Sequence, residues 1–251
     1  GDKLTILGTS VGGVTPANDI EIKVLTVSDD STNAIITFSS KGITRDKRAV
    51  AIANPNFTAY SDDGATWTEG LLSSVGDWRK IVAGQDGYVA LQNNASNVAF
   101  SYDGETWIER ALPGTDNWTD IAFGNGRFLI IAEGSNAVAT STDGLTWTSG
   151  TIPNSDDSTT AQWQKVEYGA GQFVVLSGSD QQSAVTTNGS AWTLYLNALP
   201  AGEYDFAGFA YGDNRFIGVT FSGKTVYSLD RGQTFKLGTQ IPQLDSVDIQ
   251  I

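Results

Sequence analysis

Hydrophobic residues in this chain gather in short runs that are separated by turns rich in Gly, Asn and Asp. Apolar runs occur at residues 88–91, 128–131, 173–176 and 216–219, and a short turn precedes each of them. Runs of this length with turn residues at their ends are typical of buried strands. The repeats contain no stretch with the apolar spacing of a helix, so the chain is predicted to be all-β.

The predicted strands belong to an internal repeat that carries two motifs. The first motif, Ser-x-Asp-Gly-x-Thr-Trp, starts at Ser61, Ser101 and Ser141, and looser copies start at Thr186 and Ser228. The second motif, Trp-x-x-(Ile or Val)-x-x-Gly, runs in phase with the first. It starts at Trp78, Trp118 and Trp163, and a related copy starts at Phe206.

The length of the repeat indicates the architecture. A four-stranded sheet cannot bury both faces alone, and a repeat of about 40 residues that holds four short strands is typical of a β-propeller blade. The 251 residues of the chain correspond to about six such repeats. The sequence therefore predicts a single domain, residues 1–251, folded as a propeller of six four-stranded blades.

The ends of the chain suggest how such a propeller closes. Residues 246–251 alternate apolar and polar side chains like the first strand of a repeat, although no repeat follows them. We predict that they pair with N-terminal strands near residues 4–7 and 20–27 in one shared blade, which leaves no free edge at the closure. A worn copy of the first motif at Ser28 lies unusually close to Ser61, so the strands between 28 and 48 stay unassigned.

The Asp-Gly pair of the first motif predicts a tight turn between two strands, because Gly supplies a backbone conformation with positive φ. The Asp carboxylate and the Ser and Thr hydroxyls are suited to bind the amides of the turn, and the Trp is suited to wedge between neighbouring sheets. The residues predicted to have this structural role are Ser61, Asp63, Gly64, Trp67, Ser101, Asp103, Gly104, Trp107, Ser141, Asp143, Gly144, Trp147, Asn188, Gly189, Trp192, Asp230, Gly232 and Phe235.

The first motif resembles the Asp-box, Ser-x-Asp-x-Gly-x-Thr-Trp, of propellers of the sialidase type, of related glycoside hydrolases, and of sortilin-like and photosystem-assembly propellers. The resemblance covers residues 48–238. The first three copies are one residue shorter between Asp and Gly, as in many bacterial and phage propellers, whereas the copy at Ser228 keeps the extra residue. The resemblance implies that the turns lie on the rim away from the active face and have a structural role. The alternative function of repeated Asp-Gly turns is calcium or substrate binding.

The composition removes several classes of chemistry. The chain has no His and no Cys, so imidazole bases, thiol nucleophiles and Cys/His zinc sites are impossible. Its 28 acidic and 15 basic residues give a net charge of −13, which repels phosphate backbones and anionic head groups. No stretch approaches the length of a membrane-spanning segment. We predict no nucleic-acid partner, no membrane insertion, no metal site and no cofactor.

Glycoside hydrolysis is the catalytic activity that the composition leaves open, because it needs only carboxylates, Tyr and Arg. The sialidase resemblance would require three arginines that clamp a carboxylate, a Tyr nucleophile with an acidic partner, and an Asp acid/base. Only Arg79 and Arg110, with Glu203, Tyr204 and Asp205, are placed to converge on the face opposite the turns. We predict no catalytic residues, and a glycosidase of the Asp-box type is the alternative.

The loops opposite the turns are rich in amides and hydroxyls, with aromatic residues nearby. Such groups suit the two-way hydrogen bonding of sugar hydroxyls. An equally simple interpretation is that the loops form a protein-interaction surface and that the Trp residues pack between blades. The candidate residues for glycan or partner binding are Asn93, Asn94, Glu133, Asn136, Asp180, Gln181, Trp78, Trp118 and Trp163.

The shortened boxes, the polar surface and the acidic, cysteine-free blades are similar to propeller domains of bacteriophage virion proteins, such as tail fibres, receptor-binding proteins and decoration proteins. This similarity of style and fold is an analogy. It leads to the hypothesis of a non-enzymatic binding or structural protein, located in a virion or outside the cell. Its partner would be a cell-surface carbohydrate or another protein, with assembly into a larger particle.

Overall fold

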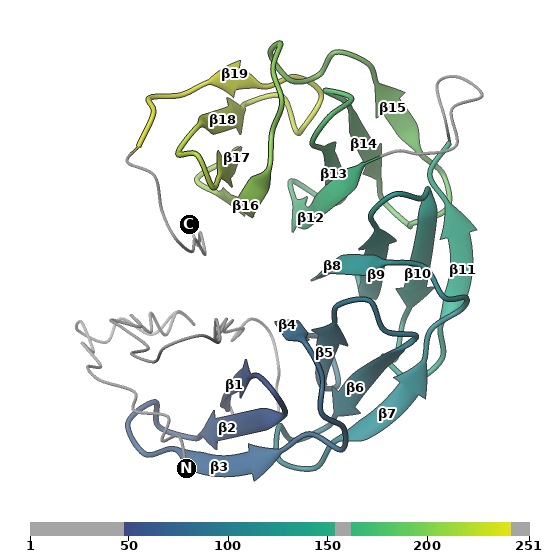
Figure 1. Ribbon diagram of the computed structural model, residues 1–251, viewed down its shortest axis with the longest axis vertical. Helices are drawn as coiled ribbons and strands as arrows, with labels where there is room; N and C mark the ends of the chain where they lie inside the picture. The colour runs from purple at the N-terminus through teal and green to yellow at the C-terminus, as the bar shows by residue number, and fades with distance from the viewer. Residues whose placement is uncertain (1–47, 154–161, 242–251) are drawn as a thin grey trace. The chain divides into compact units, whose positions relative to one another are not determined.

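The computed structural model describes residues 48–153 and 162–241. In this part of the chain nineteen strands form five antiparallel sheets, and no helix occurs. Within each sheet, strands that are neighbours in space are also consecutive in sequence (Figure 1). The all-β prediction is therefore confirmed.

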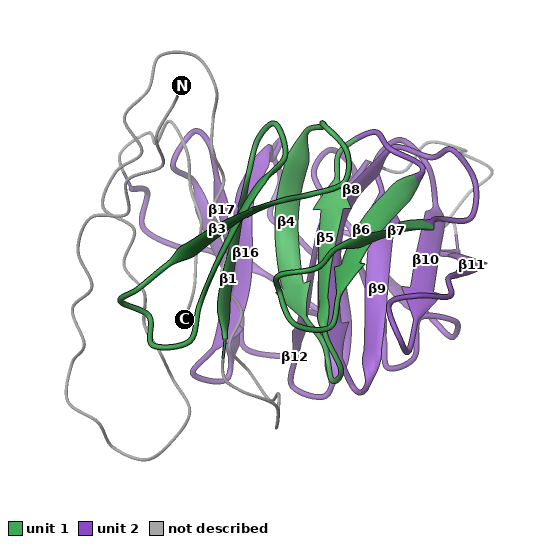
Figure 2. Ribbon diagram, turned by 90° about the horizontal axis from the view of Figure 1, so that it is seen from below, with its two compact units in different colours: residues 1–93, 97–110 green, residues 94–96, 111–251 purple. Residues whose placement is uncertain are grey.

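The chain divides into two compact units, coloured separately in Figure 2. Unit 1 comprises residues 1–93 and 97–110, and unit 2 comprises residues 94–96 and 111–251. The sheets that begin in unit 1 are formed by β1 (Ala49–Ala53), β2 (Phe57–Ser61) and β3 (Thr68–Leu71), and by β4 (Trp78–Ala83), β5 (Tyr88–Gln92), β6 (Asn97–Ser101) and β7 (Ile108–Ala111).

Unit 2 holds three four-stranded sheets. The first consists of β8 (Trp118–Gly124), β9 (Arg127–Ala132), β10 (Ala137–Ser141) and β11 (Thr148–Thr151). The second consists of β12 (Trp163–Gly169), β13 (Gln172–Ser177), β14 (Ser183–Thr186) and β15 (Thr193–Tyr195). The third consists of β16 (Phe206–Gly212), β17 (Arg215–Thr220), β18 (Thr225–Ser228) and β19 (Lys236–Leu237).

The second strand of each four-stranded sheet contains one of the predicted apolar runs. The runs lie in β5, β9, β13 and β17 and are almost entirely buried. The last residue of the second motif is Gly because the next sheet approaches closely. A Cβ at Gly124 would lie 1.9 Å from Cγ of Tyr168, and a Cβ at Gly169 would lie 2.1 Å from Cγ of Tyr211.

The core consists of side chains on facing sheets within each unit. In unit 1, Val50 and Ile52 of β1 belong to one buried cluster with Trp78 and Ile81 of β4. In unit 2, one cluster joins the sheets that start at β8 and β12, and another joins the sheets that start at β12 and β16. These clusters bury the large apolar side chains that make the sheets stack.

The prediction of six four-stranded sheets differs from the five sheets of the described residues. The sheet of β1 has three strands there, although all five residues of β1 are buried. The predicted strands at residues 4–7, 20–27 and 246–251 lie outside the described residues, as does the worn motif at Ser28. The blade count, the closure and the single domain over residues 1–251 stay predictions.

Within the described residues, no helix is long and apolar enough to cross a membrane.

Candidate functional site

The repeated turns connect the last two strands of each sheet. In the turn after β2, the Ser61 hydroxyl accepts the amide of Gly64 at 2.8 Å and donates to Oδ1 of Asp63 at 3.1 Å. The same carboxylate oxygen accepts the amides of Ala65 and Thr66 at 2.8 and 2.7 Å. In the next three turns, the side-chain oxygens of Asp103, Asp143 and Asn188 each accept hydrogen bonds from two backbone amides in the same way.

These hydrogen bonds hold the turn carboxylates in their ionised form. The amide of Thr66 contributes most to lowering the pKa of Asp63 from 3.8 to about 2. The amide of Thr146 is the main cause of the lowered pKa of Asp143. At Asp103, burial acts to raise the pKa, and the turn amides outweigh it. Because a general acid needs a raised pKa, these carboxylates are suited to a structural role.

The Gly of the turn is required for two reasons. Gly104 has a φ of 77° and Gly232 a φ of 86°, in the left-handed region that disfavours residues with a Cβ. A Cβ at Gly104 would also lie 2.4 Å from Cγ2 of Val50, and one at Gly232 would lie 2.6 Å from Val174. The turn therefore packs its backbone directly against the neighbouring sheet of its own unit.

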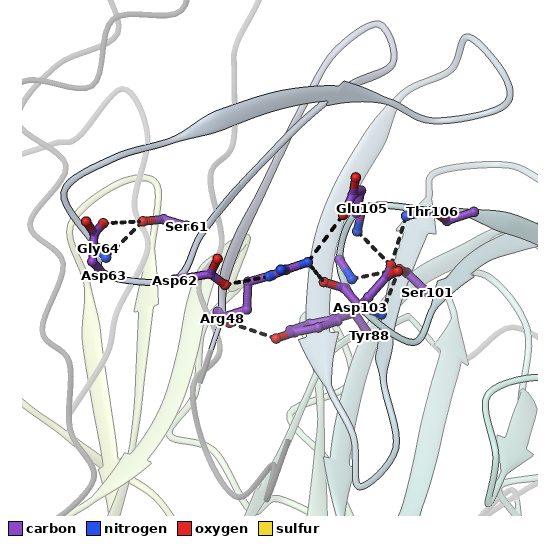
Figure 3. A network of polar contacts seen from close by, with 11 residues as sticks. Arg48, Ser61, Asp62, Asp63, Gly64, Tyr88, Ser101, Asp103, Glu105 and Thr106 are labelled. Atoms are coloured by element: carbon purple, nitrogen blue, oxygen red, sulfur yellow. Dashed lines mark hydrogen bonds and ion pairs between the residues drawn. The ribbon is translucent and has the colours of Figure 1, made fainter. Parts of the chain in front are cut away.

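Arg48 connects two of the turns in unit 1 (Figure 3). Its Nε donates to Oδ1 of Asp62 at 2.7 Å, and its Nη1 donates to the carbonyl of Asp103 at 3.0 Å and lies 3.6 Å from Glu105. The guanidinium also lies 4.4 Å from the centroid of the Tyr60 ring. The hydrogen bond to Asp62 raises the pKa of Arg48. We call these groups the Arg48 network.

A hollow of about 210 Å³ shares Tyr60 and Asp62 with the Arg48 network. The Asp62 side chain is 63 % exposed, and Asp63 is exposed as well. The six residues that line the hollow include no Lys or Arg, so its wall carries negative charge. They are Tyr60, Ser61, Asp62, Asp63, Thr66 and Thr68.

Asp77, just before β4, receives donors from two loops at the end of unit 1 opposite the turns. Its Oδ1 accepts Nδ2 of Asn54 at 3.0 Å. Its Oδ2 accepts Nε of Arg79 at 2.8 Å and Nδ2 of Asn93 at 3.2 Å. Asn93 is thus the one predicted binding residue that joins this cluster. The Arg79 side chain forms an ion pair with Asp77 and stays 41 % exposed.

The carboxylate of Glu109 on β7 is likewise held by hydrogen bonds from side chains. Its two carboxylate oxygens accept the hydroxyl of Ser73 at 2.8 Å and the Nδ2 of Asn97 at 2.6 Å. The neighbouring hydroxyl of Ser74, followed by Ser73 and Asn97, lowers the pKa of Glu109. Glu109 is therefore ionised at neutral pH and is not suited to deliver a proton.

Three large apolar side chains are exposed in unit 1, at the start of β2, at the end of β3 and on the loop that follows β3. Phe57 and Leu71 are direct cross-strand partners on β2 and β3, and they are 42 % and 61 % exposed. Val75, on the loop that follows β3, is 71 % exposed. We call these three residues the apolar patch. In the sheet of β8 to β11 the equivalent pair is Ala137 opposite Thr151, so the patch does not belong to the repeat.

In unit 2, most of the residues predicted to bind a glycan or partner form hydrogen bonds that stabilise nearby loops. Asp180 accepts the hydroxyl of Ser177 at 3.0 Å, and Nε2 of Gln181 donates to the carbonyl of Gly202 at 3.2 Å. Asn94 is an exposed turn residue with a φ of 54°.

Glu133 and Asn136 are half-buried in the loop between β9 and β10. The Glu133 amide donates to the carbonyl of Asn117 at 2.9 Å. Oδ1 of Asn136 accepts the indole N–H of Trp163 at 3.0 Å. Of the predicted unit 2 residues, the structure thus joins Asn136 and Trp163 directly.

The Trp residues proposed as stacking plates for a sugar do not present a face to a ligand. Trp78 and Trp118 are fully buried, and Trp163 is 1 % exposed. Each starts the first strand of its sheet, and Trp78 and Trp163 belong to the buried clusters. Burying a large aromatic ring stabilises the stacked sheets, so these side chains are core residues.

Tyr204 is arranged unlike a catalytic nucleophile. Its ring is buried, and its hydroxyl donates to the carbonyl of Pro200 at 2.9 Å. Burial raises the pKa of Tyr204, which disfavours the phenolate. The ammonium of Lys224 lies 5.5 Å from the ring centroid and donates to the Glu203 carbonyl at 3.2 Å.

Within residues 48–153 and 162–241, no group of three or more acidic side chains is arranged to hold a metal ion. The Arg48 network and the apolar patch were not predicted from the sequence. The available signal was Phe57, which stands where the next three copies of the repeat have Asn97, Ala137 and Gln182.

Comparison with solved structures assigns the fold. A catalytically inactive virginiamycin B lyase from Staphylococcus aureus, solved with quinupristin, has a TM-score of 0.70 and 14% identity, covering 88% of this chain and 74% of that one. YCF48 bound to D1 peptide has a TM-score of 0.59 and 16% identity, covering 86% and 70%. YCF48 from Cyanidioschyzon merolae has a TM-score of 0.55 and 16% identity, covering 81% and 70%.

These similar structures are β-propeller proteins, so the fold class of this chain is all-β with propeller-like sheets. No protein-family model matches the chain, and no curated protein matches it by sequence. At such low identity the likeness concerns the fold alone.

The comparisons overturn the virion hypothesis. The similar structures include an enzyme, virginiamycin B lyase, and YCF48, which was solved with a peptide. Nothing in these comparisons points to a component of a phage particle. The interpretation as a tail fibre, receptor-binding or decoration protein was wrong because it rested on motif style and surface composition, which many propellers share.

Proposed function

We propose that the chain is a non-catalytic, propeller-type module that binds a protein partner through the apolar patch of unit 1. The observation that carries the proposal is the exposed cross-strand pair of Phe57 and Leu71. Large apolar side chains that are exposed together are typical of interaction surfaces, because covering them removes apolar area from water.

The surroundings of the patch fit a protein interface. Such interfaces have an apolar centre and a polar rim with fixed hydrogen-bonding groups. The same end of unit 1, opposite the turns, carries the carboxylate of Asp77, which Asn54 and Asn93 hold in place, and the partly exposed side chain of Arg79. YCF48, a propeller of similar fold, has been solved with a peptide bound, which supports a protein partner at a coarse level.

The absence of catalysis is part of the proposal. Asp63, Asp103, Glu109 and Asp143 all have lowered pKa values, whereas a general acid at neutral pH needs a raised one. Assays on glycosides test this point. Turnover that is lost in Glu203→Gln or Tyr204→Phe would overturn it.

We also propose that the turns are Asp-boxes and that the full chain forms six blades. The recurrence of the Ser-Asp hydrogen bonds in successive turns and the propeller neighbours support this arrangement. Deletion of residues 246–251 tests the predicted closure. An unchanged thermal midpoint would contradict it, because the loss of an inner strand removes buried apolar contact.

A binding selection tests the function. Peptides from a random library are selected on the wild-type chain and then compared on the Phe57→Ser/Leu71→Ser double variant and on Leu229→Ser. Leu229 is 63 % exposed in unit 2, so it controls for the loss of an exposed Leu. Peptides that lose binding only with the double variant support the proposal. Selection without binders, or equal binding to all three proteins, overturns it.

A further inference from the structure

The outer strand β3 ends in an exposed large apolar residue, Leu71, where the outer strands β7 and β11 end in Ala111 and Thr151. It lies at the edge of its sheet, in the order β1, β2, β3, and no other described strand pairs with it. Its residues Thr68, Glu69 and Leu71 are exposed. Edge strands are normally protected by charges, by Pro or by their short length. β3 has one charged residue, and its last residue is the Leu of the apolar patch.

The two faces of β3 carry different chemistry. Directly opposed residues of an antiparallel pair lie on the same face, so Leu71 shares a face with Phe57. Thr68 lies opposite Tyr60, on the other face, where both residues line the acidic hollow. One end of the strand therefore borders an apolar surface, and the other end borders a negatively charged hollow on the opposite face.

We propose that an extended basic peptide adds, as a further antiparallel or parallel strand, to the edge of β3 that no other described strand covers. This inference rests on the proposed function and specifies its partner. Strand addition supplies affinity through main-chain hydrogen bonds, and the pockets for alternate side chains supply specificity. The peptide carries a Lys or Arg for the hollow beside Asp62 and Asp63, and a large apolar residue for Phe57 and Leu71.

Charge complementarity selects a cation for the hollow. The wall contains the carboxylates of Asp62 and Asp63, and Glu105 lies nearby in the Arg48 network. The single cation of this network, Arg48, already bonds to Asp62 and to the carbonyl of Asp103. A cationic side chain of the partner therefore meets excess negative charge, and salt weakens the attraction.

The register of the strand sets the spacing of the two anchors. Thr68 and Leu71 are three positions apart, and residues an odd number of positions apart point to opposite faces of a sheet. The cationic and apolar residues of the partner must therefore also be three positions apart. A spacing of two would place both side chains on one face and lose one of the contacts.

Synthetic peptides with capped ends and a Thr/Val background test these statements by fluorescence anisotropy. The probe has Lys and Leu three positions apart. One control shortens the spacing to two, a second replaces Lys by Glu, and a third is N-methylated on alternate amides. We expect the probe to bind, and each control to bind at least about tenfold more weakly. Hydrogen exchange of the amides at residues 68–71 should slow when the probe is bound.

Variants of the full chain complete the test. Leu71→Ser should weaken binding of the probe by about tenfold, whereas Leu229→Ser should not. Equal binding of the N-methylated peptide overturns strand addition, and equal binding at a spacing of two overturns the register. If the probe does not bind while library peptides still depend on Phe57 and Leu71, this inference fails and the proposed function stands. If binding of the probe and of the library peptides is independent of Phe57 and Leu71, the inference and the proposed function both fail.

Discussion

Asn188 occupies in the fourth turn the place that Asp143 occupies in the third. Oδ1 of Asp143 accepts the amides of Leu145 and Thr146 at 2.8 and 2.9 Å, and Oδ1 of Asn188 accepts two equivalent amides at 3.0 Å. The turn thus requires an oxygen acceptor at this position and not a negative charge.

Asp143→Asn should therefore fold normally at neutral pH and lose a source of acid sensitivity. The pKa of Asp143 is lowered in the folded chain, so its ionisation contributes stability above the ordinary value of 3.8, and this is lost as the pH falls through the lowered pKa. Urea unfolding at several acidic pH values should show a shallower pH dependence for the variant.

Asp143→Ala removes the oxygen acceptor together with the charge, whereas Asp143→Asn removes only the charge. It should destabilise the chain by about 1 kcal/mol at neutral pH, because two turn amides lose their acceptor. Asp86→Asn, at an exposed turn position, is the control. It should change neither the stability at neutral pH nor the dependence of stability on acidic pH. Equal stability of Asp143→Ala and wild type would contradict the structural role of the carboxylate.

Gly104→Ala should be much more destabilising than Gly126→Ala. Both residues have positive φ, 77° and 69°, so both variants incur about 1 kcal/mol of backbone strain. Only at Gly104 does the new Cβ meet Val50, at 2.4 Å, whereas nothing lies within 4 Å at Gly126. Overpacking adds about 1–3 kcal/mol, which chemical denaturation would measure. Similar losses of stability in the two variants would show that Val50 moves aside at little cost when residue 104 gains a Cβ.

Trp163→Phe should cost about 1 kcal/mol more than Trp118→Phe. Both rings are buried, but the indole N–H of Trp163 donates to Asn136, whereas that of Trp118 has no hydrogen-bond partner among the described residues. Replacement by Phe therefore removes a hydrogen bond only at Trp163. Thermal and urea unfolding check the difference, and a larger loss for Trp118→Phe would contradict the assigned bonding.

Arg48→Met should destabilise unit 1 by about 1 kcal/mol, because it removes the contacts with Asp62 and with the Tyr60 ring. Arg48→Lys should restore only part of the loss, since an ammonium cannot form the forked contacts of a guanidinium. The wild-type advantage should shrink in high salt. Full stability of Arg48→Lys would show that charge alone is sufficient.

Much of the local structure could be predicted because it depends on neighbours in sequence. The turns at Asp63 and Gly64 use hydrogen bonds that span three residues or fewer, so the motif alone indicates them. The apolar runs predicted the second strand of four sheets for the same reason. The virion interpretation had no such physical basis.

What the sequence by itself determined is the repeat, its strands and the chemistry of its turns, because these follow from short-range spacing and backbone preference. Only the tertiary structure decided which side chains are covered. It buried Trp78, placed Arg48 between two turns, and left Phe57 and Leu71 exposed side by side on β2 and β3. Exposure depends on packing between residues far apart in the chain, so an apolar residue of the core and one of a binding surface look alike in the sequence.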